Sequence, residues 1–254
     1  MHRMRSPRKV NAGAMLVELM VGLAVSSIVI GAAIAALLVA RDAAATVNEL
    51  AVLQQDASHA LRVLGLQVRT AGSNELSASP VNAGAFRFVV NPPAGAYAGS
   101  VHGTDGAADA GDSVTLVQTS PPLLASQQYD CLGQGASPGQ LVEATFQVSS
   151  ESALRCKSLK GKPQPLVAGV AAFKVRYRVR QGDQIRSLAA AEVEAAQLWP
   201  AVTALEVCLE LQGEAHSAAF DASYVDCQQR RVGTGGRLRL VTRKLFSLPV
   251  QPKA

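Results

Sequence analysis

Residues 13–40 read GAMLVELMVGLAVSSIVIGAAIAALLVA, and this stretch decides the fold. Its one formally charged residue is Glu18, five positions after Gly13. An uninterrupted helix of this length measures ~40 Å at ~1.5 Å per residue, enough to cross a ~30 Å hydrocarbon core. The stretch therefore predicts a membrane-spanning helix.

The residues ahead of this stretch are basic. They read MHRMRSPRKVNAG, with Arg3, Arg5, Arg8 and Lys9 and no acidic residue. Basic residues beside an apolar span hold that end of the span in the cytoplasm. We therefore expect the remainder of the chain to project away from the cytoplasm.

The basic leader, the Gly directly before the apolar run and the acid five residues later resemble the class III signal of type IV pilins and pseudopilins. In that family a prepilin peptidase cuts after the Gly and methylates the new N-terminus. The resemblance implies cleavage after Gly13, a methylated N-terminus at Ala14 and an assembly role for Glu18. The family usually has Phe and then Thr at the first two mature positions, where this chain has Ala14 and Met15.

Two other interpretations of the segment are a secretory signal peptide and a plain membrane anchor. Ala33-Ile34-Ala35 would supply a small-x-small cleavage site. The apolar run, however, exceeds the ~7–15 residues of a secretory signal and contains a carboxylate. In a plain anchor, a lone Glu costs up to ~3 kcal/mol at the bilayer centre and less near an end. The pilin-type signal explains the leader, Gly13 and Glu18 together.

Glu18 has a chemical partner in the processed chain. Cleavage would create a free α-amine at Ala14, and a carboxylate four residues along a helix lies on the same face. The helix N-terminus also favours a negative charge. Glu18 can pair with its own amine or with that of a neighbouring subunit; the family resemblance favours the neighbour.

The bulk charge gives no indication of a nucleic-acid partner. The chain has 24 Lys and Arg against 19 Asp and Glu, a net charge of +5. The leader supplies four of the basic residues and no acid, so its removal leaves 20 basic against 19 acidic residues, or +1. A near-neutral mature chain carries no strong attraction for polyanions as a whole.

All four cysteines (Cys131, Cys156, Cys208 and Cys227) follow the apolar span. An even number on the outward side indicates disulfides in an oxidising compartment, and three connectivities are possible. We predict the sequential one, Cys131–Cys156 and Cys208–Cys227, in which each bridge contributes ~3 kcal/mol in the chain-entropy model. The spacing lacks the Cys-x-x-Cys or His pattern of a zinc site.

The helical pattern continues beyond residue 40 in amphipathic form. Apolar residues recur every three or four positions at Leu50, Leu53, Ala57, Leu61, Leu64 and Val68. Such a stripe predicts a helix with one buried face, and Gly72 is a suitable stop. We expect four segments: a cleaved leader at 1–13, a transmembrane half-helix at 14–40, an amphipathic half-helix at 41–72 and a β-rich globular domain at 73–254.

The β-rich domain contains several segments typical of strands. We predict strands at 86–90, 113–118, 141–148, 173–180, 201–211 and 237–246, a short helix at 189–198 and a loop at 91–112. In 173–180, apolar and basic residues alternate, as in a half-buried strand, whereas 201–211 is apolar throughout and predicted to be central. A long helix followed by antiparallel strands predicts an α+β, pilin-like fold with the helix packed on an antiparallel sheet.

Further motifs resemble minor pilins of the PilW type. They are Arg69-Thr70-Ala71-Gly72 closing the helix, Asp130-Cys131-Leu132-Gly133-Gln134, the second cysteine at 156, Gln164 to Val170 entering a strand, and Trp199-Pro200 before a long strand. The resemblance implies a single-pass inner-membrane protein with a periplasmic domain, incorporated into a pilus after processing. Its implied partners are other minor pilins, the major pilin and the prepilin peptidase.

Motifs of enzymes and metal sites do not hold up. Gly135-Ala136-Ser137-Pro138-Gly139 has the Gly-x-Ser-x-Gly pattern, but Pro138 lacks the N–H that would serve an oxyanion. Asp105, Asp109 and Asp112 crowd a Gly-rich loop without the spacing of a calcium loop, so we interpret them as turn residues. The four histidines show no triad or metal-ligand spacing and are expected in the leader, the helix and two loops. We predict no enzyme, no cofactor and no metal site.

Two predicted strands carry basic faces, with Lys174, Arg176, Arg178 and Arg180 on one and Arg237, Arg239 and Arg243 on the other. If the strands were adjacent, these residues would form a stripe able to hold a phosphate backbone, which makes DNA a candidate partner. The alternative is the solvated outer face of an antiparallel sheet, which the near-neutral mature chain favours.

The sequence therefore indicates a non-enzymatic minor pilin that takes part in priming or capping a type IV pilus. Pilus-dependent motility, adhesion or DNA uptake follows from the family resemblance alone. A minor pseudopilin of a type II secretion system would have the same signal and fold, and a membrane-tethered binding module is the alternative of a different class.

Overall fold

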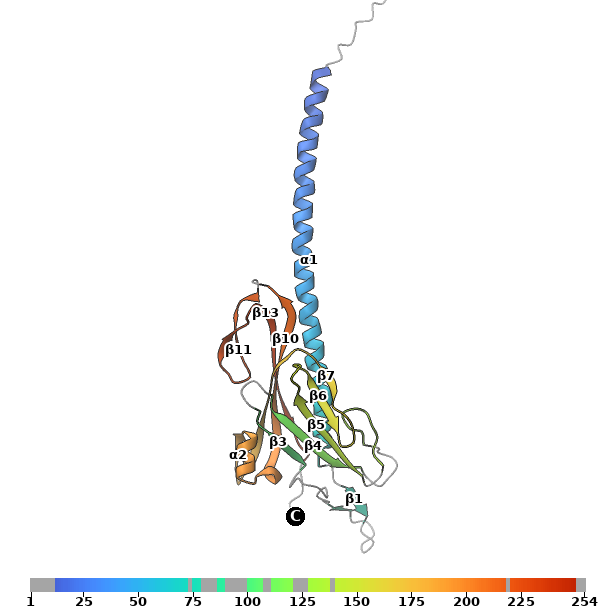
Figure 1. The fold of residues 1–254 in the computed structure, drawn as a ribbon, viewed down its shortest axis with the longest axis vertical. Helices are drawn as coiled ribbons and strands as arrows, with labels where there is room; N and C mark the ends of the chain where they lie inside the picture. Colours follow the sequence, from blue (N-terminus) through green and yellow to red (C-terminus); the bar gives the residue numbers. More distant parts are fainter. Residues whose placement is uncertain are drawn as a thin grey trace, which may run out of the picture. The chain divides into compact units, whose positions relative to one another are not determined.

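A computed structural model describes residues 12–72, 75–78, 86–89, 100–106, 111–120, 128–137, 140–217 and 220–249 (Figure 1). The chain divides into two compact units, Met1–Glu49 and Leu50–Ala254. Helix α1 (Ala12–Thr70) begins in the first unit and ends in the second.

α1 is one uninterrupted helix. It contains no proline, the residue that would remove a backbone hydrogen bond and kink or break the helix. It ends two residues before Gly72, whose φ of 66° lies in the left-handed region that glycine adopts without steric cost. The Gly72 N–H donates to the Val117 carbonyl at 2.9 Å, which ties the end of the helix to a strand.

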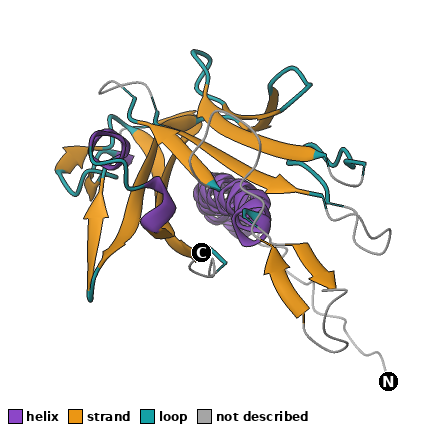
Figure 2. Cartoon of the chain, turned by 90° about the horizontal axis from the view of Figure 1, so that it is seen from below, coloured by secondary structure: helices purple, strands orange, loops and turns teal. Residues whose placement is uncertain are grey.

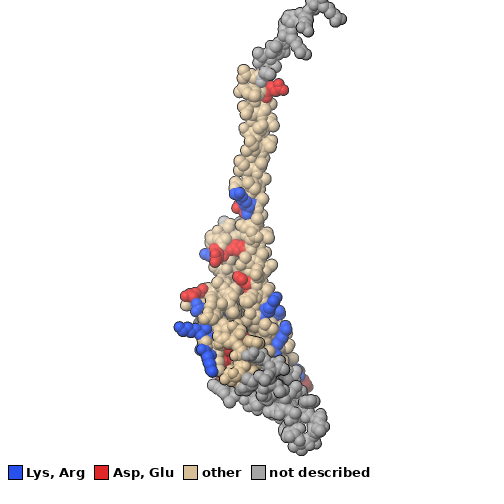
Figure 3. Space-filling view, turned by 90° about the vertical axis from the view of Figure 1, so that its right-hand side faces the viewer, with Lys and Arg blue, Asp and Glu red and all other residues tan. Residues whose placement is uncertain are grey.

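In the first unit, the described residues are helical, and from Leu16 to Ala40 they are predominantly apolar on every side, with Glu18 as the one charged residue. The large apolar side chains from Leu16 to Val39 are 53–72% exposed. Figure 3 shows this part of α1 almost entirely in tan, with one acidic patch in red near its start, whereas blue and red side chains are scattered over the second unit. A helix that is apolar all round is normally buried, either in a membrane or among other apolar chains.

In the second unit, α1 has a single buried face. The predicted stripe is confirmed at Leu53, Ala57, Leu61, Leu64 and Val68, which are all less than 7% exposed, whereas Leu50, its first member, is only partly buried. They belong to one apolar cluster with the inward-facing residues of the sheets. Figure 2 looks along the helix and shows the two larger sheets lying around part of it.

In the described part of the chain, the strands form two larger sheets and two short ribbons, and all their pairings are antiparallel. The five-stranded sheet has the order β3 (Val101–Thr104), β4 (Ser113–Thr119), β5 (Leu141–Val148), β6 (Leu154–Ser158) and β7 (Gln164–Val167). The four-stranded sheet has the order β13 (Arg237–Ser247), β10 (Val202–His216), β8 (Val170–Gln181) and β9 (Gln184–Leu188). The ribbons pair β1 (Glu75–Ala78) with β2 (Phe86–Val89) and β11 (Ser223–Val225) with β12 (Arg231–Gly233). The α+β fold class is confirmed.

Two short helices connect β9 to β10. They are α2 (Ala190–Ala195) and the 3₁₀ turn η1 (Trp199–Ala201). Asp105, at the end of β3, accepts hydrogen bonds from the backbone N–H groups of Ala190 (3.0 Å) and Ala191 (2.8 Å) and so caps α2.

β10 is central, as predicted, because it pairs with β8 on one side and β13 on the other. The predicted loop at 91–112 is wrong in part, since β3 lies within it; residues 91–99 and 107–110 fall outside the described residues. β3 spans four residues, including Gly103, and this is too short to show a strand period. Besides β3, six other short strands of three to five residues each went unpredicted: β1, β6, β7, β9, β11 and β12.

Gly103 is needed where β3 crosses the core beneath Tyr177. A Cβ on Gly103 would overlap the Tyr177 hydroxyl and lie 2.8 Å from the Ser113 carbonyl oxygen. Tyr177 is fully buried, and its hydroxyl has no hydrogen-bond partner among the described residues. Burial, with the charges of Asp112 and Asp105 adding to it, raises the pKa of Tyr177 far above its usual value.

Gly103→Ala is expected to lower the free energy of unfolding by about 1–3 kcal/mol, because it over-packs a filled site. Denaturant unfolding of the purified full chain in detergent, followed by fluorescence of the sole tryptophan, Trp199, measures this. Gly233→Ala is the matched control, since a Cβ there meets nothing within 4 Å. Tyr177→Phe removes the overlapping oxygen and should recover part of the loss in the double variant. An additive double variant would contradict this account.

Candidate functional site

The predicted processing and assembly residues lie at the start of α1. Gly13 and Ala14 are in its first turn, and Glu18 is exposed on the helix. Among the described residues, α1 is the one helix long and apolar enough to cross a membrane, judged by length and composition. Between residues 16 and 40 Glu18 is its only formal charge, so whatever surrounds this helix must also accommodate one carboxylate.

The two predicted basic strands are not adjacent. β10 lies between β8 and β13, so the continuous stripe that adjacency would give is not formed. The register places Lys174 of β8, Cys208 of β10 and Arg243 of β13 in one row. Paired residues share a face, so β10 contributes Glu206, Cys208 and Glu210 to the same surface.

Acidic residues neutralise several of these basic side chains. Three ion pairs join them: Lys174 Nζ to Asp112 Oδ1 at 2.8 Å, Arg178 Nη2 to Glu206 Oε2 at 2.7 Å, and Arg239 Nη1 to Glu210 Oε1 at 3.3 Å. The Glu210 side chain is 5% exposed, so this last pair is shielded from water. Three of the seven basic side chains of this surface are therefore in ion pairs with acidic residues.

The β11–β12 ribbon lies over the β13 side of this face. The Cys208–Cys227 disulfide joins the sheet to the turn between β11 and β12. Arg243 donates to the Asp226 carbonyl, and the Tyr224 hydroxyl donates to Glu210. Arg239 also lies over the Tyr224 ring, 5.8 Å from its centre.

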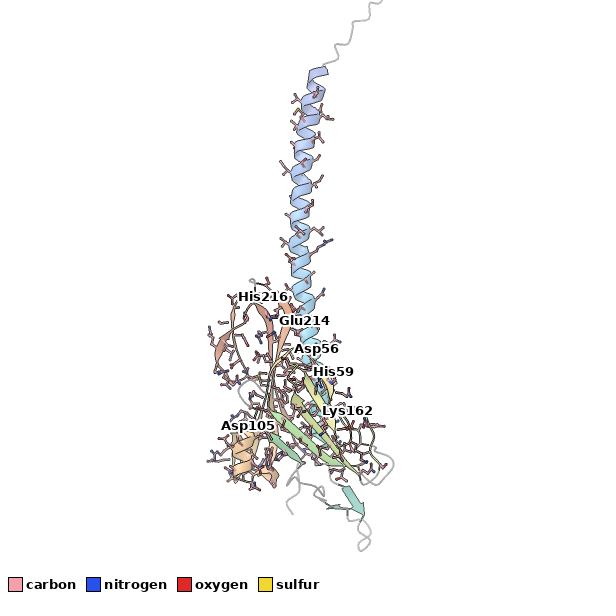
Figure 4. All side chains as sticks on the ribbon, in the orientation of Figure 1. Asp56, His59, Asp105, Lys162, Glu214 and His216 are labelled. Atoms are coloured by element: carbon pink, nitrogen blue, oxygen red, sulfur yellow. A yellow bond between two sulfur atoms is a disulfide. The ribbon has the colours of Figure 1, made fainter. Side chains whose placement is uncertain are left out.

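The other basic side chains of the two strands differ in their partners. Arg237 donates to the carbonyls of Gly213 and Glu214, near the end of β10 that Figure 4 marks with Glu214 and His216. Arg176 donates to the Ser187 hydroxyl and carbonyl on β9. Arg180 is exposed and has no ion-pair partner among the described residues.

The second disulfide joins Cys131 to Cys156, with Cα atoms 6.3 Å apart. It ties the segment before β5 to β6 inside the five-stranded sheet. The Asp130 side chain next to it accepts hydrogen bonds from the Leu132 and Gln134 N–H groups, which shapes the turn. The cysteines thus have the sequential pairing.

The aspartates of the Gly-rich segment support the fold. Asp112 accepts hydrogen bonds from Lys174 Nζ and from the Val175 and Gly106 N–H groups, and Asp105 caps α2. Asp109 lies outside the described residues. Within the described part of the chain, no three His, Cys, Asp or Glu side chains gather as a metal site would require.

Two histidines expected in loops lie on strands instead. His102 is on β3, with its ring 4.7 Å from that of Trp199 and its Nε2 3.4 Å from Glu194 Oε2. The hydrogen bond from the Trp199 indole lowers the pKa of Glu194, although desolvation opposes it. His216 ends β10, His59 is exposed on α1, and His2 lies outside the described residues.

Two groups in the ribbon have shifted pKa values. Burial and the hydrogen bond to Glu210 raise the pKa of Tyr224 to about 12. Desolvation alone would raise the pKa of Asp226, but the backbone N–H and guanidinium of Arg230 outweigh it, so the pKa is lowered. Asp226 also accepts a hydrogen bond from the Gln228 N–H at 2.9 Å and is the centre of this turn.

Comparisons with known proteins give one structural similarity. No protein-family model matches the chain, and no curated protein matches it by sequence. Among solved structures, the chain is similar to the type IV-like pilin TTHA1219 from Thermus thermophilus. Sequence identity is 16%, the similarity covers 78% of this chain and 95% of that one, and the TM-score is 0.45. A likeness of this degree says nothing of what this chain does.

Asp226→Asn is expected to lower the free energy of unfolding at pH 7 by about 1–2 kcal/mol, because it weakens the charge-assisted hydrogen bonds that the buried carboxylate accepts from Arg230. The folded-state pKa lies below the unfolded value, so this stabilisation is present above the unfolded pKa of ~3.9 and is lost as the pH falls through the folded one. Denaturant unfolding at pH 7 and at pH 2–3 tests this. Asp183→Asn, in the exposed β8–β9 turn, is the control. An equal loss at both pH values would contradict the account.

Proposed function

We propose that this protein is a type IV pilin-like subunit, specifically a minor pilin of the PilW type, and that it acts as a structural component and not as an enzyme. The observation that carries the proposal is the apolar stretch of α1 up to residue 40, which follows Gly13 and a basic leader and has Glu18 as its one charged residue. This helix needs an apolar environment before and after assembly. The membrane supplies this environment before assembly, and the helices of other subunits supply it afterwards.

In the proposed pathway, the chain starts as a single-pass inner-membrane protein with its second unit in the periplasm. The prepilin peptidase cuts between Gly13 and Ala14 and methylates Ala14. The mature subunit then joins other minor pilins and the major pilin in a complex that primes or caps the filament. Two disulfides suit an oxidising compartment on the outward side of the membrane.

Glu18 is the proposed assembly contact. A carboxylate in apolar surroundings needs a partner, and the N-terminal amine of a neighbouring subunit at the same depth supplies a positive charge. Pairing with a neighbour gives a selective contact, since a subunit lacking either charge would leave the other one buried and uncompensated.

DNA is a weaker part of the proposal. Three of the basic side chains of β8 and β13 that suggested it form ion pairs, and three more donate to hydroxyl or carbonyl groups of the protein. Among the described residues, Arg180 is the member of that set with neither an ion pair nor a side-chain hydrogen bond. Any contribution to DNA uptake would then come from assembling the filament, with DNA contacted elsewhere.

Processing is expected between Gly13 and Ala14. Intact mass and N-terminal sequencing of the mature protein should give a methylated chain beginning at Ala14. Gly13→Ala should leave the uncleaved precursor in the membrane, whereas Gly22→Ala, deeper in the apolar run, should be cleaved normally. A mature chain that starts near Ala36 would indicate an ordinary signal peptide and overturn the proposal.

Glu18→Ala is expected to block assembly without affecting folding. The variant should accumulate, be cleaved and keep both disulfides, yet fail to co-purify with other pilins or to restore piliation in a strain lacking the wild-type gene. Asp42→Ala, which removes an exposed acid beyond the apolar run of the same helix, should assemble normally. Normal piliation by Glu18→Ala would favour a plain tether, and restored protein secretion in place of piliation would favour a type II pseudopilin.

A further inference from the structure

A pocket of about 450 Å³ lies on the outer face of the four-stranded sheet. Its floor includes Lys174 and Arg176 of β8, Cys208 of β10 and Arg243 of β13. One wall includes Asp105, which Figure 4 labels beside α2. The opposite wall is the turn of the β11–β12 ribbon, from Cys227 to Gln229, which the disulfide to Cys208 anchors on the sheet.

The pocket contains three acidic and three basic side chains, but the two kinds differ in what they can still bind. Asp105 uses one oxygen for the Ala190 N–H and the other for the Ala191 N–H. Asp112 accepts from Gly106 and Lys174 on Oδ1 and from the Val175 N–H on Oδ2. Both carboxylates therefore act mainly as acceptors for the protein itself.

Glu206 is the third acid of the pocket. Its Oε2 accepts a hydrogen bond from Arg178 at 2.7 Å. Within the described part of the chain, Oε1 of Glu206 is the one carboxylate oxygen in the pocket without a hydrogen bond from the protein.

The cations keep unused donors. Lys174 gives one of its three ammonium protons to Asp112. Arg176 gives one N–H each to the hydroxyl and carbonyl of Ser187, out of five. Arg243 gives one to the Asp226 carbonyl. The pocket thus offers many directed N–H donors and few open acceptors, which suits an anion rich in acceptor oxygens.

The strand register brings these donors to one place. Lys174 and Arg243 flank Cys208 in a single row, two inter-strand spacings or ~10 Å apart, and Arg176 is two residues along β8 on the same face. Long side chains from both strands can therefore reach a group held above Cys208. The walls on both sides limit the length of such a group, and the volume lies within the ~300–1,000 Å³ typical of small-molecule sites.

We infer that this pocket binds a small carboxylate- or phosphate-bearing molecule through Arg176, Lys174 and Arg243. The ligand sits over the Cys208–Cys227 disulfide, between α2 and the β11–β12 turn. Because the three acids balance the three cations in charge, directed hydrogen bonds supply the affinity in place of a long-range field. The ligand is a discrete small anion and not a polymer.

Isothermal titration of the purified full chain in detergent tests this, with inorganic phosphate and with succinate, at constant ionic strength set by NaCl. At least one probe should give saturable binding, and the two titrations separate a phosphate site from a carboxylate site. Arg176→Gln should weaken binding about ten-fold or more, the effect expected for a lost charge-assisted hydrogen bond. Arg180→Gln makes the same charge change on the same face of β8, outside the pocket, and should leave affinity within about two-fold.

An unfolding midpoint equal to that of the wild type shows that the Arg176→Gln variant is folded. If the midpoint is lower, Arg176→Lys takes its place, because lysine keeps the charge and loses the planar guanidinium with its paired N–H donors. Absence of saturable binding by both probes overturns the inference. Equal weakening by Arg176→Gln and Arg180→Gln also overturns it, because that result means diffuse attraction. Neither outcome bears on processing at Gly13 or assembly through Glu18.

Discussion

The packing of one helical stripe against two sheets is the interaction on which the second unit depends. Leu53, Leu61, Leu64 and Val68 of α1 belong to the same apolar cluster as the inward side chains of β8, β10 and the five-stranded sheet. Aromatic residues make up 4% of the chain, so most of this core comes from Val, Leu and Ala. The inward faces are thereby filled, which leaves the outward faces of the sheets to carry the polar groups.

Long periodic segments were predictable from sequence because their pattern reflects local geometry. The stripe of α1 and the alternation of β8 show on which face each residue lies without knowledge of any partner. Strands of three to five residues, such as β3, have too few positions to show a period and are held by pairing with distant segments. The order of the strands in a sheet also depends on pairing between distant segments. No pattern within β8 or β13 reveals that β10 lies between them.

The charged face shows the limit of local patterns most clearly. The basic residues of β8 stand out because they alternate within one strand, whereas their partners come from elsewhere: Asp112 directly precedes β4, and Glu206 lies on β10. On sequence alone the cations therefore look unpaired. The apolar run with Glu18 differs from these strands, because all its relevant residues lie in one segment. The sequence alone therefore indicates that the run needs apolar surroundings and a partner for one carboxylate.

The disulfide between Cys208 and Cys227 holds the β11–β12 ribbon on the charged face of the four-stranded sheet. The segment between β10 and β13 contributes few buried apolar side chains, so packing alone gives it little stability on the sheet. A covalent link restricts the unfolded segment and, with the Arg243 and Tyr224 hydrogen bonds, keeps one wall of the pocket in place. Because α1 packs on the inward face and the pocket opens on the outward one, the proposed assembly through the helix and the proposed binding of a small anion use different surfaces.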